Sequence, residues 1–284
     1  MKISTQERGS RTMSLTLGNA PFGTKEYGTF NVPLEHRDHI LYLHPSPRRV
    51  RVEFGGEVVA ESDHMKRLHE SGQHPVYLFP REDVNMDLLE ATEHRTPSET
   101  KGEARHWTVK AGGKEAENAA WSWESPPEGA PPLAGYVVFD WDAMDAWYEE
   151  DEQIHVHPRD PYHRVDVRDT HRHVRVSRDG EVLAETDRAK VLFETSLPPR
   201  YYIPPEDVRQ DLLVHSDTHT GCPYKGTASY YSLKLGDKVL TDAVWYYPEP
   251  LEEAERVAGY LSFYPNKVDI EIADGGNGSG RRSG

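Results

Sequence analysis

The chain has 284 residues, a formal net charge of −15 and one cysteine. The negative field argues against phosphate backbones and anionic membranes as partners, and no apolar run approaches the roughly 18 residues of a membrane span. A single cysteine excludes an internal disulfide, and the polar start lacks the apolar core of a signal peptide, so a cytoplasmic protein is expected. Aromatic residues make up 10% of the chain and predict a folded core.

The first half of the chain predicts short strands separated by turns, after a flexible arm over residues 1–23. A strand at 40–43 ends at the Pro45 region, because proline cannot donate to a sheet ladder. The pair Gly55-Gly56 predicts a tight hairpin between strands 50–54 and 57–61. The other elements expected in this domain, which is assigned to 24–147, are a helix at 63–70, a strand at 76–79, helical turns at 82–89, and strands at 104–109, 114–123 and 135–139.

An internal repeat organises the whole chain. Arg51–Glu61 aligns with Arg175–Glu185, an offset of 175 − 51 = 124, and the same offset relates Lys101-Gly102 to Lys225-Gly226. Chance does not hold one register over about 100 positions, so the chain is predicted to be a duplication. The fold class expected is mainly β, with two tandem compact domains and short helices, the second domain spanning 148–272.

A second alignment predicts an insertion in the second copy. Leu43-His44-Pro45 resembles Val156-His157-Pro158 at an offset of 156 − 43 = 113, which is 124 − 113 = 11 residues short of the main offset. The linker 160–170 is therefore expected to be inserted before the second hairpin. The Gly-rich residues 273–284 predict a disordered tail.

Several motifs together resemble one family. Val-Arg-Val-x-x-x-Gly-Glu-Val, Tyr-x-x-Pro-x-Glu-Asp-Val, Cys-Pro-Tyr-Lys-Gly-x-Ala-x-Tyr and Trp-Tyr-Tyr-Pro-Glu-Pro are similar to two-copy members of the domain of unknown function 427 family, over about 48–147 and 154–271. The resemblance implies a β-tent or Mss4-like fold, whose zinc knuckles this chain lacks. The family's nucleotidyltransferase label points to Asp140 and Asp142 as a carboxylate pair, but the second copy has Tyr264 and Asn266 there.

The loop around Cys222 is the first candidate site. Pro223 favours an extended backbone at Cys222, and a nearby Lys225 lowers the pKa of a thiol, so Cys222, Tyr224 and Lys225 are candidate catalytic residues, with His215 or His219 as a base. The alternative is a small buried thiol in a turn. The first copy has Ser98-Glu99-Thr100 before a retained Lys101-Gly102, so the Lys-Gly half is expected to serve the shared turn.

The inserted linker and the Cys222 loop are hypothesised to build one pocket in the second copy. Its substrate-binding residues would be Arg159, Tyr162 and Arg164, which suit a carboxylate or phosphate, with Tyr202 and Trp245 as aromatic lining. Glu185 is a candidate general acid or base, or else a structural ion-pair partner of Lys225.

A histidine-rich stretch offers a second possibility. His155 and His157 would share one face of a strand, and His163, Asp160 or Asp166 would complete a metal site. The spacing matches no known metal motif, so structural roles are preferred and neither a metal nor a cofactor is predicted.

Three functions remain open at this stage. The first is hydrolytic or acid–base chemistry on a small organic molecule in the second copy. The second is non-catalytic binding of a small ligand in the same pocket. The third is a structural or self-associating β protein, and homo-oligomers are compatible with each.

Overall fold

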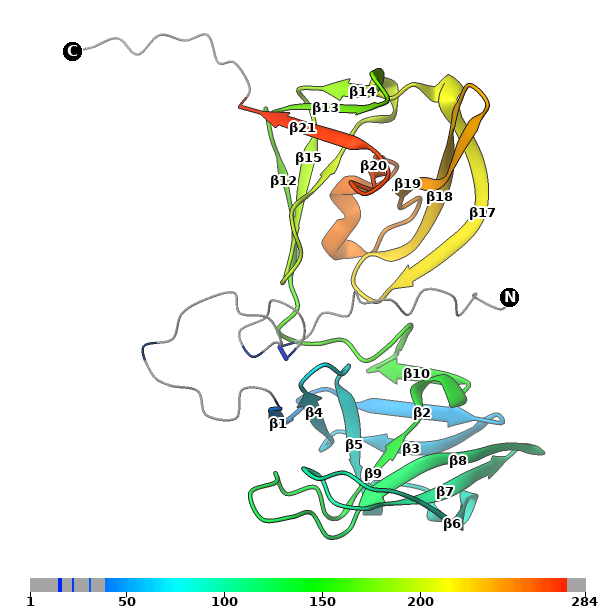
Figure 1. The fold of residues 1–284 in the computed structure, drawn as a ribbon. Coiled ribbons are helices and arrows are strands. Elements are labelled where there is room, and N and C mark those ends of the chain that lie inside the picture. The colour runs from blue at the N-terminus through cyan, green and yellow to red at the C-terminus, as the bar shows by residue number, and fades with distance from the viewer. Residues whose placement is uncertain (1–14, 17–21, 23–30, 32–38, 275–284) are drawn as a thin grey trace. The chain divides into compact units, whose positions relative to one another are not determined.

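The computed structural model describes residues 15, 16, 22, 31 and 39–274 (Figure 1). The predicted arm at 1–23 lies almost wholly outside these residues, and so does the predicted tail beyond Asp274. The chain is mainly β and divides into two compact units, the first running to His163 and the second starting at Arg164. No helix in the described part is long and apolar enough to cross a membrane.

The first unit contains two antiparallel sheets around an apolar core. One sheet has the order β1-β4-β5-β9-β8-β7-β6 and the other β11-β10-β2-β3. Its elements are β1 (Leu41–Pro45), β2 (Val50–Phe54), β3 (Glu57–Ser62), β4 (Lys66–Glu70), β5 (Val76–Pro80), η1 (Arg81–Asp83), η2 (Met86–Leu88), β6 (Leu89–Thr96), β7 (Ala104–Ala111), β8 (Lys114–Trp123), β9 (Tyr136–Phe139), η3 (Trp141–Ala143), β10 (Ala146–Glu149) and β11 (Glu152–Ile154).

The second unit repeats this plan with shorter sheets, ordered β12-β15-β16, β14-β13-β21 and β17-β18-β19-β20. Its elements are β12 (Val165–Asp169), β13 (His173–Arg178), β14 (Glu181–Thr186), β15 (Lys190–Glu194), β16 (Arg200–Tyr202), η4 (Pro205–Asp207), η5 (Gln210–Leu212), β17 (Leu213–Cys222), β18 (Gly226–Leu235), β19 (Lys238–Tyr246), η6 (Glu252–Val257), β20 (Ser262–Phe263) and β21 (Asp269–Ala273). Figure 1 shows β17, β18 and β19 as long curved strands.

Strand register confirms the duplication in detail. Phe79 pairs with Val137 between β5 and β9, and the isolated bridge from Ile203 to Leu261 repeats that pair 124 residues later. The β7–β8 bulge beside Trp107 and the β18–β19 bulge beside Tyr231 also lie at equivalent positions. Bulges of this kind tend to be retained within families.

The predicted insertion is wrong. Leu41 pairs with Glu70, and Val165 pairs with Glu194, so β1 and β12 are equivalent at the offset of 124. Residues 165–169 of the predicted insertion are therefore the first strand of the second domain. The alignment of His44-Pro45 with His157-Pro158 joined two segments of different structure.

Two further expectations need correction. The predicted helix at 63–70 contains strand β4, in which Arg67, Leu68 and His69 are all buried because both faces of the sheet are covered. The predicted boundary at 147/148 falls inside β10, which pairs with β2 and belongs to the first unit. The predicted hairpin at 50–61 is confirmed, and the helical turns expected over 82–89 are the 3₁₀ helices η1 and η2.

Candidate functional site

Cys222 ends strand β17 at a tight hairpin. It pairs with Gly226, the first residue of β18, and the three residues between them form the loop. Gly226 has φ +91°, and a Cβ there would lie 3.2 Å from the carbonyl oxygen of Glu249, so the turn requires glycine. Gly102 has φ +87° at the equivalent place in the first domain. The prediction that Gly226 serves a turn shared by both domains is confirmed.

Lys225 forms an ion pair with Glu194 on β15, and the equivalent Lys101 pairs with Glu70 on β4. The Lys225 and Glu194 side chains are only 11% and 7% exposed. Because both domains contain this pair, it is part of the shared frame. The ammonium of Lys225 is held by a carboxylate, so the structure gives no support to its predicted activation of Cys222.

An aromatic cluster packs against the half-buried Cys222 and is called the Cys222 cluster below. Trp245 Nε1 donates a hydrogen bond of 3.1 Å to the Tyr202 hydroxyl, and Thr220 Oγ1 lies 2.7 Å from the Tyr230 hydroxyl. Its buried rings are Tyr202, Tyr224, Tyr230, Trp245 and Tyr247, with Cys222, Tyr260 and Tyr264 partly buried beside them. Cys222, Tyr224, Tyr202 and Trp245, which were predicted to belong to one pocket, thus lie in one cluster.

The hydroxyls of this cluster lie in a low-dielectric setting. Burial raises the pKa of Tyr247, and the neighbouring Tyr202, Cys222 and Glu194 raise it further. Burial likewise raises the pKa of Tyr202, whose hydroxyl accepts from Trp245. Both phenols are therefore neutral groups at physiological pH, and each can donate or accept a hydrogen bond.

The first domain fills the equivalent space with different side chains. Leu78 stands where the second domain has Tyr202, and Trp123 where it has Tyr247. His106 replaces Tyr230, and Ser98 replaces Cys222. The fold can therefore be built without these hydroxyls and without the thiol.

Glu185 lies apart from the Lys225 pair. It is an exposed residue of β14, where it accepts from His173 Nε2 at 3.0 Å and from Arg175 at 3.3 Å. The alternative prediction that Glu185 is the structural partner of Lys225 is wrong, because that partner is Glu194. The candidate bases have other contacts too: His219 Nδ1 lies 2.9 Å from the carbonyl oxygen of Asp217, and His215 packs edge-on against Tyr231.

The predicted substrate-binding residues from the linker are divided between the two units. Tyr162 belongs to the first unit, where its hydroxyl lies 3.2 Å from that of Tyr42 on β1 and its ring packs against His69 of β4. Arg159, half-buried, precedes it in the same unit. Arg164 starts the second unit and pairs with Asp166. Since no insertion exists, the reason for grouping Arg159 and Tyr162 with the Cys222 loop is lost.

The proposed histidine metal site is not supported. Strand β11 ends at Ile154, and Val156 has φ +77° within a tight turn closed by a 3.0 Å bond from His157 N to the carbonyl oxygen of His155. His155 and His157 are therefore not neighbours on one strand face. Among the described residues, no group of three His, Cys, Asp or Glu side chains is placed to hold a metal ion. The carboxylate pair implied by the family label has a local role: Asp140 accepts a hydrogen bond from Asp142 N at 3.0 Å and so caps η3.

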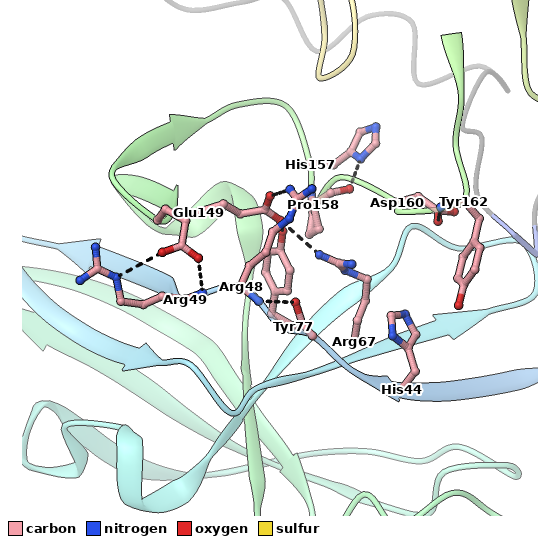
Figure 2. Close-up of polar contacts among 12 residues, drawn as sticks. His44, Arg48, Arg49, Arg67, Tyr77, Glu149, His157, Pro158, Asp160 and Tyr162 are labelled. Carbon is pink, nitrogen blue, oxygen red and sulfur yellow. Dashed lines mark hydrogen bonds and ion pairs between the residues drawn. The ribbon is translucent and has the colours of Figure 1, made fainter. Parts of the chain in front are cut away.

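A buried charge network lies in the first domain, and no pattern in the sequence predicts it (Figure 2). Glu149 of β10 accepts hydrogen bonds from Arg48, from Arg67 at 3.1 Å and from the Tyr77 hydroxyl at 2.6 Å. Arg67 and Glu149 are 4% and 5% exposed. The second domain has Val191 in place of Arg67, so no repeat signal marks this network.

A protein-family model matches both halves of the chain. The model of the family described as domain of unknown function (DUF427), NTP_transf_9, matches the chain twice, over residues 42–150 and 166–274. These two ranges correspond to the two structural copies and differ by 166 − 42 = 124 residues. No curated protein matches the chain.

Proposed function

The chain belongs to the DUF427 family as a two-copy member, and on this basis we propose that its second domain binds a small organic molecule at the Cys222 cluster. The observation that supports the proposal is the exchange of side chains between the copies. The shared frame, including the ion pair of Lys225 and Glu194, is retained, while Leu78 and Ser98 of the first domain are replaced by Tyr202 and Cys222.

Hydroxyl-bearing rings in a core are informative because folding alone does not require them. A buried phenol needs a hydrogen-bond partner, whereas leucine at the same place needs none. Binding sites for small molecules combine apolar walls with a few placed polar groups, and the second domain provides both around one thiol. The partly buried Cys222, Tyr260 and Tyr264 would be the members that a ligand reaches first.

We propose binding ahead of a chemical step for a structural reason. Two of the four predicted catalytic residues have other partners, since Lys225 pairs with Glu194 and Glu185 pairs with His173 and Arg175. In the proposal Cys222 and Tyr224 are therefore ligand contacts, with Tyr202 and Trp245 as the aromatic wall.

Ligand-observed NMR on the full chain tests the proposal, with phenol, catechol, indole and benzoate as probes. Tyr247→Phe keeps the ring and removes one hydroxyl, so a probe that uses this hydroxyl should bind about fivefold more weakly, the equivalent of one hydrogen bond of about 1 kcal/mol. Cys222→Ala should also weaken binding. Ser98→Ala, at the equivalent position of the first domain, is the matched control and should change nothing.

Two results would overturn the proposal. One is that no probe binds in a way that responds to Tyr247→Phe or Cys222→Ala. The other is that a bound probe is lost equally with Ser98→Ala, which would place the binding in the first domain or on the general surface. Thermal unfolding of each variant shows whether a loss of binding reflects a loss of folding.

A further inference from the structure

The segment 155–163 docks on the first domain just before the chain enters the second unit. Asp160, 2% exposed, anchors it: one carboxylate oxygen accepts from Tyr162 N at 2.8 Å and the other from Leu15 N at 2.6 Å. His163 N donates to the carbonyl oxygen of Asp160 at 3.1 Å. Figure 2 shows His157, Asp160 and Tyr162 above the strands that carry Arg67 and His44.

Histidines form much of this contact. His157 lies against His74, from the turn between β4 and β5, with ring centroids only 3.8 Å apart. Its Nδ1 lies 2.7 Å from the carbonyl oxygen of Pro158. A carbonyl can only accept, so Nδ1 carries the proton, and a second proton on the ring would place a charge directly against His74.

We propose that residues 155–163 form a proton-sensitive latch on the first domain, held by the contact of neutral His157 with His74 and released when His157 is protonated. The geometry alone favours neutral rings, because two imidazolium rings with centroids 3.8 Å apart would repel each other at this half-buried contact.

The pKa of His157 also indicates that docking favours the neutral ring. Burial lowers the pKa of His157 to about 3, with His74 and His163 adding to the effect. The docked segment therefore binds fewer protons than the free one between pH 6.5 and 3. By linkage, docking is strongest above pH 6.5 and weakens as the pH falls below it.

A second buried histidine faces the same segment and has a mixed environment. His69 of β4 is fully buried, with Nε2 3.2 Å from His44 Nε2 and Nδ1 3.8 Å from Asp160. Burial lowers the pKa of His69 to about 3, and the neighbouring His44 and Arg67 lower it further. Burial also raises the pKa of Asp160, so its docked carboxyl binds a proton more readily than the free one. This effect partly offsets the weakening of docking at low pH.

Amide hydrogen exchange measured by NMR on the full chain tests the latch. The reporters are the amides of His157, Tyr162 and His163, each hydrogen-bonded in the docked segment. After correction for intrinsic exchange, their opening constant should rise about 30-fold between pH 7.5 and 5.0, as expected for one histidine of ordinary pKa about 6.5 that is neutral when docked. Amides of β7 and β8 report whether the whole domain opens instead.

His157→Phe keeps an aromatic ring and removes the titration, so its opening constant should lose this pH dependence. His64→Gln, at an exposed histidine paired with Asp63, is the control and should behave like the wild type. Equal pH dependence in the wild type and His157→Phe would overturn the proposal, as would an unchanged opening constant in the wild type. If His157→Phe fails to dock at pH 7.5, the pKa of His157 measured by NMR in the wild type decides, and an ordinary value near 6.5 refutes the latch.

Discussion

Substitution of Glu149 by glutamine tests whether the first-domain network is a true buried ion pair. The carboxylate accepts from Arg48, Arg67 and Tyr77, and its side chain is 5% exposed. Glu149→Gln keeps the size and one acceptor oxygen but removes the negative charge. The guanidinium of Arg67, 4% exposed, is then left buried beside a neutral group.

The expected loss in the free energy of unfolding is large for a substitution that replaces one oxygen by an amide nitrogen. Removal of one partner from a buried ion pair costs about 3–5 kcal/mol, since the remaining charge stays out of water. A domain of this kind has a total free energy of unfolding of roughly 5–15 kcal/mol. The melting temperature of the first domain should therefore fall by roughly 10–20 °C.

Differential scanning calorimetry of the full chain is the assay, because the unfolding of the second domain serves as an internal reference. Glu185→Gln is the matched control: it neutralises an exposed carboxylate, 43% exposed, and should shift stability by no more than about 0.5 kcal/mol. The double variant Arg67→Val with Glu149→Leu should recover most of the loss, because the second domain folds with Val191 at the place of Arg67. A loss below about 1 kcal/mol for Glu149→Gln, or no recovery in the double variant, would refute the reasoning.

Two further predictions concern the second domain. Lys225→Met removes the ammonium that pairs with the buried Glu194 carboxylate, 7% exposed, and should destabilise this domain by about 2–4 kcal/mol in urea unfolding. The loss should exceed that of Lys101→Met in the first domain, where Glu70 is 16% exposed; equal small effects would show that the shared ion pair is not buried. Hydrogen bonds to Asp187 and Glu185 raise the pKa of His173. His173 therefore stabilises the fold below its unfolded pKa of about 6.5, and this contribution is lost as the pH rises through the folded pKa. An NMR titration should give a His173 pKa above 6.5 in the wild type and a lower one in Asp187→Asn; an unchanged pKa in that variant would contradict the assignment.

The sequence alone was sufficient for much of the fold because the chain contains its own alignment. The offset of 124 located both copies, and Gly55-Gly56 located the first hairpin. Strand β4 was misread as a helix because Met65, Leu68 and His69 fall on one helical face. Its counterpart Lys190–Glu194 contains Val-Leu-Phe, a clear strand signal, so comparison of the copies would have corrected the assignment.

The candidate site was predictable in part. Cys222, Tyr202 and Trp245 were selected by residue type, and the structure places them in one cluster. Glu194 was missed, although it lies 124 residues after Glu70 as Lys225 does after Lys101. The first-domain network could not be found in this way, because Arg67 and Glu149 are 82 residues apart and have no charged counterparts in the second copy.

The turn at Val156 gives the docked segment a further property. A β-branched residue at φ +77° is held in a backbone conformation that costs of order 1–3 kcal/mol, and its side chain is 43% exposed, so packing returns little of that energy. A segment released from the domain would be free to leave this conformation. Docking therefore works against the backbone strain at Val156, and the contacts of Asp160 and His157 hold a segment that this strain biases toward release.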